Sequence, residues 1–182
     1  MPSIYDWLRP VDVVILDAIG EPYEQVRRQS HSTLPVLTEW NFINLYVTRP
    51  AVFRFNDPIH GFTTPPAKFL SLGAERDGSI YAVTLSPQVE TLPLDASMRI
   101  LVDLENQFRR GGWRPILVSD NPPIEDTPAT RDAMRRCLTP TTYWQAGDKL
   151  QIVLYVHCFQ RDGHPNEDRY LITLELAESF IT

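Results

Sequence analysis

The chain has 182 residues, of which 43% are hydrophobic and 22% are charged. This balance is ordinary for a globular protein and argues against wholesale disorder. The net charge of −6 at pH 7 argues against non-specific nucleic-acid binding, because proteins of that class need a basic surface.

The N-terminal region contains two segments with a helical pattern. Apolar residues recur with a helical period from residue 10 to residue 19, and Gly20 is a suitable C-terminal stop. A strand over residues 11–16 is the alternative, because β-branched side chains are dense there. Residues 21–28 predict a second short helix with a proline near its start. We therefore expect an αα corner at the beginning of the domain.

The following segments have the features of β-strands. Residues 42–47 are one strand candidate, and residues 51–55 are a second candidate with clean alternation of side chains. Residues 59–67 are rich in glycine, threonine and proline, which predicts a loop.

A hairpin and a long amphipathic helix are the clearest predictions. Two β-prone runs, residues 68–72 and 79–85, lie on either side of Asp77-Gly78, a dipeptide that favours a hairpin turn. The helix begins near Pro93 and ends at Gly111-Gly112. Its apolar residues recur at steps of three and four, which places them on one face: Leu94, Met98, Leu101, Leu104 and Phe108.

The C-terminal part predicts one more helix between strands. Residues 114–118 predict a short strand and residues 119–125 a proline-rich loop. Thr127 is a suitable N-cap for a helix that begins with proline. Residues 149–160 and 169–176 predict two long strands that form a second hairpin.

These elements together predict an α+β fold. We expect a mainly antiparallel sheet, packed on one side by amphipathic helices and containing two hairpins. A single domain over residues 1–182 is expected, and any division into lobes would fall at about 1–113 and 114–182.

The two cysteines, Cys137 and Cys158, lack the spacing of a zinc site. We favour two buried thiols, and one disulfide is the alternative. No apolar run is long enough to span a bilayer, and no signal peptide is visible at the N-terminus.

Known catalytic and cofactor motifs are absent from the sequence, so no catalytic residue, cofactor or metal is predicted. One pair of residues, Asp57 and His60, could form an acid–base pair because the two residues are three apart in a loop. The favoured interpretation is a turn in which Asp57 accepts hydrogen bonds from the backbone ahead of it.

A second group of polar residues lies at the predicted tip of the C-terminal hairpin: Asp162, His164, Glu167 and Asp168. Loop tips are commonly polar, so a solvated turn is the plainer interpretation. The functional interpretation is an acidic projection that enters a groove of a partner protein.

Several segments resemble bacterial envelope proteins found among the immunity proteins of type VI secretion effectors. The resemblance covers roughly residues 19–113 and implies no shared site motif, so it assigns no functional residues. The segments that carry it are Gly20-Glu21-Pro22-Tyr23-Glu24-Gln25-Val26-Arg27, Phe53-Arg54-Phe55-Asn56-Asp57-Pro58, Gly61-Phe62-Thr63-Thr64-Pro65-Pro66-Ala67-Lys68-Phe69, Leu85-Ser86-Pro87-Gln88, and the run from Leu104 to Gly111-Gly112-Trp113.

The resulting hypothesis is a non-enzymatic binding protein that neutralises a cognate bacterial toxin by covering its active site. The expected partner is the effector protein, and the expected contacts are the hairpin tip first and the loop with Asp57 and His60 second. Two alternatives are a structural component of a secretion machine and a small-ligand-binding protein or enzyme that uses Asp57 and His60. The expected compartment is the periplasm if a signal or anchor has been removed, and otherwise the cytoplasm.

Overall fold

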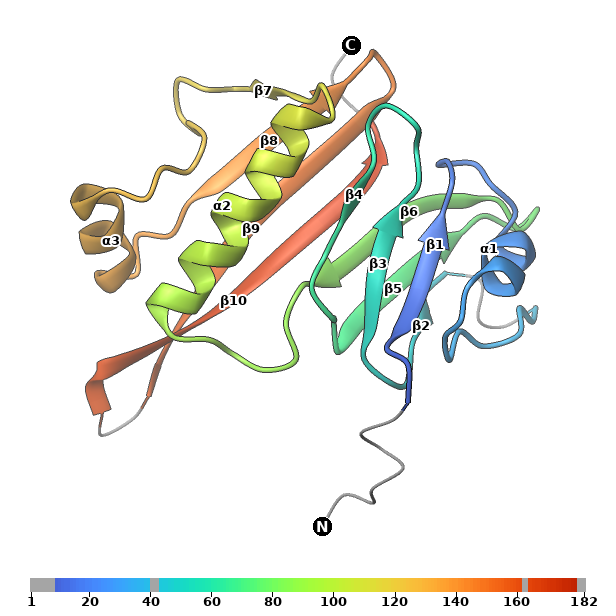
Figure 1. Cartoon of the computed structure of the whole chain (residues 1–182), viewed down its shortest axis with the longest axis horizontal. Helices are drawn as coiled ribbons and strands as arrows, with labels where there is room; N and C mark the ends of the chain where they lie inside the picture. Colours follow the sequence, from blue (N-terminus) through green and yellow to red (C-terminus); the bar gives the residue numbers. More distant parts are fainter. Residues whose placement is uncertain (1–8, 40–42, 162–163, 180–182) are drawn as a thin grey trace.

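The structure is a computed structural model that describes residues 9–39, 43–161 and 164–179, without the side chains of residues 161–166. The described residues form helices and strands in the order βαβββββαβαβββ (Figure 1). Their bounds are β1 Asp12–Leu16, α1 Tyr23–Gln29, β2 Leu45–Tyr46, β3 Ala51–Phe55, β4 Phe62–Thr63, β5 Phe69–Ala74, β6 Ile80–Ser86, α2 Leu94–Arg110, β7 Arg114–Ile116, α3 Pro128–Arg135, β8 Thr141–Ala146, β9 Leu150–Arg161 and β10 His164–Glu178.

The strands form two sheets. The larger sheet has the strand order β2-β5-β6-β10-β9-β8-β7, and all of its neighbouring strands are antiparallel. The smaller sheet has the order β1-β3-β4, in which β1 and β3 are parallel. The predicted α+β class with a mainly antiparallel sheet is therefore confirmed. Because β6 pairs with β10, strands from both sides of Trp113 belong to one sheet.

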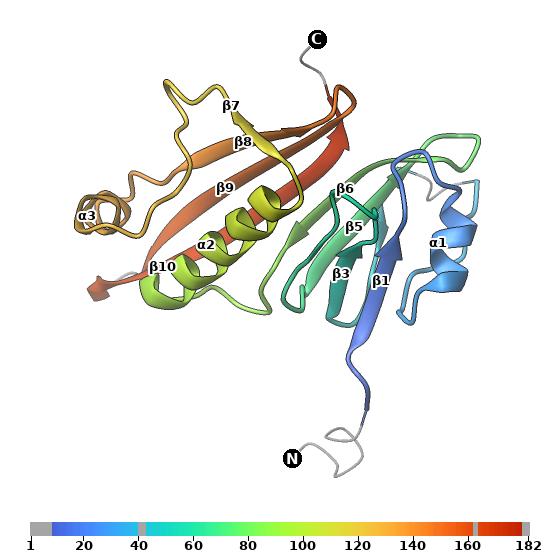
Figure 2. The ribbon, with the colours of Figure 1, turned by 45° about the horizontal axis from the view of Figure 1, so that its top comes forward.

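One face of the large sheet is covered by two different layers. Helix α2 lies over β8, β9 and β10, and the small sheet lies over β5 and β6 (Figures 1 and 2). Aromatic rings fill the space where these layers meet. The ring centroids of Phe62 and Phe108 are 5.2 Å apart, and those of Phe108 and Trp144 are 5.6 Å apart. Such edge-on and tilted pairs add to the free energy gained from burying the rings.

Helix α2 follows the predicted apolar pattern. Met98, Leu101, Leu104 and Phe108 are all fully buried. The helix ends where Gly112 adopts a φ of +71°, a left-handed conformation that glycine tolerates without steric cost. The amide of Trp113 then donates to the carbonyl of Phe108 at 2.9 Å, so the helix end is satisfied as in a Schellman motif.

Both predicted hairpins are present. Strands β5 and β6 are joined by a turn in which Asp77 accepts from the Ser79 amide at 2.9 Å and Gly78 has a φ of +86°. Strands β9 and β10 form the longer hairpin. Thr127 caps α3 as expected, since its side-chain oxygen accepts from the amide of Thr130 at 3.2 Å.

The favoured helix at residues 10–19 is wrong, and the alternative of a strand at residues 11–16 is confirmed. Residues 12–16 form β1 and not a helix, because their β-branched side chains alternate between buried and partly exposed positions beside β3. Only α1 follows, so no αα corner opens the chain. Strand β8 was not predicted, although Thr142, Trp144 and Ala146 alternate into the core.

Candidate functional site

The outer part of the β9–β10 hairpin extends beyond the rest of the large sheet (Figure 1). Strand β8 pairs with β9 only as far as Tyr155, and β6 pairs with β10 only from Leu174 onward. Beyond these points the hairpin is a two-stranded ribbon, held on one side by a bridge between Leu92 and Tyr170. The ribbon passes the N-terminal end of α2 and forms a projection from the protein body.

The structure describes two of the four predicted hairpin residues in full. Glu167 is exposed, whereas Asp168 is partly buried. His164 pairs with Arg161 through the backbone, but its side chain is outside the described part. Asp162 lies outside the described residues altogether.

Asp168 lies on the side of the ribbon that faces α3, because a carboxylate oxygen of Asp168 is within 4.8 Å of the sulfurs of Cys137 and Cys158. Tyr170, two residues further on, is fully buried on this inner face. Arg169 pairs with Phe159 on the outer face, where the Phe159 side chain is 48% exposed. The outer face of the ribbon therefore combines an exposed ring with charged side chains.

A hollow of about 490 Å³ lies at the base of the ribbon. It is lined by Glu167, Asp168, Arg169 and Tyr170 of β10, by Arg135 of α3, and by Pro93 and Leu94 at the start of α2. Sequence reasoning found the carboxylates of this hollow but not Arg135, because nothing in the local sequence places α3 beside the hairpin.

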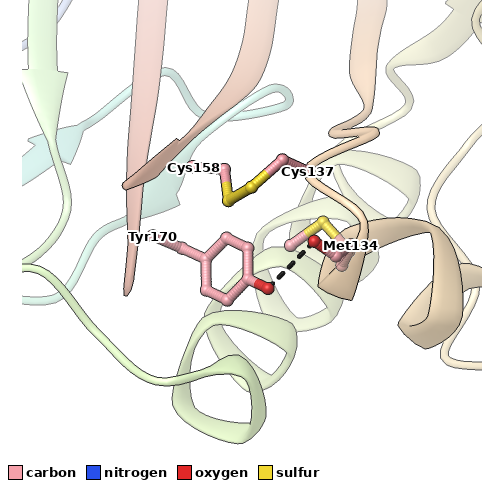
Figure 3. The surroundings of a disulfide bond; sticks show 4 residues. All are labelled: Met134, Cys137, Cys158 and Tyr170. Carbon is pink, nitrogen blue, oxygen red and sulfur yellow. Dashed lines mark hydrogen bonds between the residues drawn. A yellow bond between two sulfur atoms is a disulfide. The ribbon is translucent and has the colours of Figure 1, made fainter. Parts of the chain in front are cut away.

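A disulfide between Cys137 and Cys158 joins the end of α3 to β9 at the base of the ribbon (Figure 3). The favoured prediction of two buried thiols is wrong, and the alternative of a disulfide is confirmed. The hydroxyl of Tyr170 donates to the carbonyl of Met134 at 3.0 Å beside it. Burial, and then the charge of Asp168, raise the pKa of Tyr170, so the hydroxyl keeps its proton as a donor.

Cys137 has an unusual backbone conformation. Its φ of +56° lies in the left-handed region, where helix ends normally place glycine. The amides of Cys137 and Leu138 donate to the carbonyls of Met134 and Ala133, both at 2.9 Å, which completes a Schellman motif. A side chain at this position costs roughly 1–2 kcal/mol relative to the right-handed region, and the disulfide formed by Cys137 explains why glycine is not used.

The second predicted group, Asp57 and His60, lies in a turn before β4. The carboxylate of Asp57 accepts from the amides of Ile59 at 2.9 Å and His60 at 2.7 Å, as the favoured turn interpretation predicts. The Nδ1 of His60 donates to the carbonyl of Gly111 at 2.6 Å, since a carbonyl can only accept. The indole of Trp113 donates to the carbonyl of His60 at 2.8 Å. The hydrogen bonds of His60 with Gly111 and Trp113 therefore fasten this loop to the C-terminal end of α2, whereas Asp57 bonds only within its own turn.

A hollow of about 380 Å³ is lined by Asp57 and His60 together with Asp148, Lys149 and Glu178. The two predicted groups do not form one site. The first lies at the start of α2 and the second at its end, and a helix of 17 residues is roughly 25 Å long.

Sequence reasoning missed the buried carboxylate of Glu105 on α2. The residue is 0% exposed, and one carboxylate oxygen accepts from the Ile124 amide at 2.8 Å. The other oxygen is buried without a hydrogen-bond partner. Burial raises the pKa of Glu105 to about 7, although the Ile124 amide and the nearby Arg109 oppose the shift. The available signal was a glutamate between Leu101 and Phe108 on the apolar face of the helix.

Arg131 connects α3 to the start of α2. Its guanidinium bonds the carboxylate of Asp126 at 2.6 and 3.0 Å and also bonds Asp95. Asp126 and Asp95, in that order, raise the pKa of Arg131. This network holds α3 in place, and the disulfide in turn holds the hairpin to α3.

No protein-family model matches the chain, and comparison with curated proteins and with solved structures gives no match. None of the helices in the described part has the length and apolar character needed to cross a membrane.

Proposed function

We propose that this protein is a non-enzymatic binding protein, an immunity protein that neutralises a cognate bacterial toxin by covering its active site. The observation that carries the proposal is the projecting β9–β10 ribbon with its braced base. A projection of this kind can enter a groove that a flat surface cannot reach.

The bracing of the ribbon supports a role in binding. The disulfide and the Tyr170 hydrogen bond fix the base of the ribbon to α3, and Arg131 fixes α3 to α2 through Asp95. A projection that is already ordered loses less conformational entropy when it binds. The same contacts would be unnecessary for a turn that only connects two strands.

The outer face of the ribbon has the two features that protein interfaces use. Phe159 is an exposed ring that can enter a pocket on a partner, and buried aromatic anchors commonly dominate binding energy. Glu167 adds negative charge to a protein whose net charge is −6. This charge would accelerate capture of a basic partner, and the effect would weaken with added salt.

The disulfide also supports the proposed periplasmic compartment. Structural disulfides persist in oxidising compartments and are rare where the thiol pool is kept reduced. A toxin partner that acts in the bacterial envelope would meet the protein there.

The first test is affinity capture of the full-length protein from its native lysate with mass spectrometry of the bound proteins. The expected result is one stoichiometric partner that is toxic when expressed alone and harmless when co-expressed with this chain. A partner whose toxicity persists on co-expression would refute the inhibitor function.

Variants then test the ribbon as the contact surface. Phe159→Ala should raise the dissociation rate, and Glu167→Lys should slow association at low salt by about threefold or more. Glu75→Lys, at the exposed turn between β5 and β6, is the matched charge control and should leave both rates unchanged. Equal rates for Glu167→Lys and Glu75→Lys, together with unchanged binding by Phe159→Ala, would exclude the ribbon from the interface.

A further inference from the structure

Three side chains at the base of the ribbon are grouped like metal ligands. The Sγ atoms of Cys137 and Cys158 and a carboxylate oxygen of Asp168 all lie within 4.8 Å of one another. They come from the end of α3, from β9 and from β10. Among the side chains that the structure describes, no other three from His, Cys, Asp or Glu meet in this way.

Asp168 has an oxygen without a partner at this point. Its Oδ1 is buried and makes no hydrogen bond. A buried carboxylate oxygen without a hydrogen-bond partner lowers the stability of the folded protein, and such oxygens are uncommon, so a ligand that pairs with this oxygen is worth considering. The adjacent disulfide does not supply a partner, because oxidised sulfur has no proton to donate.

We propose that the reduced protein binds one Zn²⁺-like divalent cation through Cys137, Cys158 and Asp168. A dithiol reductant first exchanges with the disulfide, which gives two protein thiols and the oxidised, disulfide form of the reductant. The cation then binds two thiolates and the carboxylate, and the two thiol protons pass to solvent. Both cysteines are partly exposed, so a reductant can reach them.

The geometry suits this ligand set. Zinc binds thiolate sulfur at about 2.3 Å and carboxylate oxygen at about 2.0–2.2 Å, so tetrahedral ligand atoms lie roughly 3.5–3.8 Å apart. Once the disulfide is cleaved, rotation of the cysteine side chains can separate the sulfurs to this distance. The Cα atoms of Cys137 and Cys158 are 5.4 Å apart, a separation larger than that of the two sulfurs of a zinc site. Solvent occupies the fourth position, and the ion gives the Asp168 oxygen its partner.

The same three residues would then hold the ribbon to α3 in two chemical states. The disulfide makes the connection in an oxidising compartment, and the cation makes it in a reducing one. This inference does not depend on the proposed toxin partner, since it concerns only the base of the ribbon.

The test uses full-length protein, reduced and freed of reductant under anaerobic conditions, with Co²⁺ as a spectroscopic substitute for zinc. Reduced wild-type protein should bind one Co²⁺ per chain with thiolate-to-cobalt charge-transfer absorption. The oxidised protein should show no such absorption. Asp168→Asn should weaken Co²⁺ binding by about tenfold or more, because lost ligand-shell groups have effects of this size. Glu167→Gln removes the neighbouring, exposed carboxylate, which is not one of the three proposed ligands, and should bind like the wild type.

Reduced wild-type protein that binds no Co²⁺, or binds it without thiolate absorption, overturns the proposal. So does equal affinity of Asp168→Asn and Glu167→Gln. A second measurement needs only the wild type and therefore does not depend on how a variant folds. Zn²⁺ should protect both thiols of the reduced protein from alkylation, and alkylation at the same rate with and without Zn²⁺ overturns the proposal.

Discussion

Glu105 should make the stability of the protein depend on pH between about 4.5 and 7. Its pKa is about 7 in the folded protein, against an ordinary value of 4.5. Below pH 4.5 both the folded and unfolded chains carry the proton. As the pH rises, the unfolded chain loses the proton first, so stability falls until the pH passes the folded pKa. The shift of roughly 2.5 units corresponds to about 3 kcal/mol at 1.36 kcal/mol per unit.

The assay is urea unfolding of wild type and Glu105→Gln at a series of pH values from 4.5 to 8. Glutamine is neutral throughout and can still accept from the Ile124 amide, so the variant should lack this fall in stability. Above pH 7 the variant should be the more stable protein, by up to about 3 kcal/mol. Asp103→Asn, which replaces an exposed carboxylate on the same helix, should keep the wild-type slope. The same slope in wild type and Glu105→Gln would refute the reasoning.

Three further predictions concern the elements that hold the ribbon and α2. Replacing both Cys137 and Cys158 by alanine removes the disulfide and should lower the free energy of unfolding by about 3 kcal/mol. The bond links residues 21 apart in the sequence and so restricts the unfolded chain; chemical denaturation without reductant measures the loss. Gly112→Ala should lower the free energy of unfolding by about 1 kcal/mol or more, because Gly112 has a φ of +71°, a conformation that alanine disfavours; a lower midpoint in thermal unfolding would show this. Tyr170→Phe should lower the free energy of unfolding by about 1 kcal/mol, because it removes one of the hydrogen bonds that the Met134 carbonyl accepts and leaves the one from the Cys137 amide; unfolding in urea tests this.

The parts of the fold that were predictable from sequence are those whose local signals agree with their tertiary positions. Helix α2 has an apolar stripe, a proline start and a double-glycine end, and each feature has the expected role. The β5–β6 hairpin likewise follows from its Asp77-Gly78 turn. In such segments, propensity, pattern and turn chemistry favour the same structure.

The wrong or missing predictions concern segments whose secondary structure is determined by pairing with neighbouring strands. The apolar residues of β1 fit a helical period as well as a strand, and the parallel pairing with β3 selects the strand. Strand β8 was missed although Thr142, Tyr143 and Trp144 are residue types that favour strands; the segment is short, and its pairing with β9 defines it.

The candidate site was only partly predictable for the same reason. The hairpin and its acidic residues are local features and were found. The meeting of Cys137 with Cys158 depends on where α3 lies, and so does the approach of Arg135 to the hollow. The place of Glu105 on the apolar face of α2 is visible in the sequence, but its hydrogen bond with the Ile124 amide depends on where the loop that carries Ile124 lies. Contacts between distant segments of this kind have no signature in the local sequence.

The central position of β10 has a consequence for synthesis of the protein. This strand is the last of the described elements to leave the ribosome, yet it pairs with both β6 and β9 in the middle of the large sheet. Until it emerges, β6 and β9 each have an unpaired edge and the buried side of α2 has no central strand to contact. The two halves of the sheet can therefore join only after nearly all of the described chain has been translated. Pairing between such distant segments makes folding slow relative to helical proteins of similar size. Until the sheet is complete, the open edges of β6 and β9 are therefore the parts of the nascent chain most exposed to pairing with other strands.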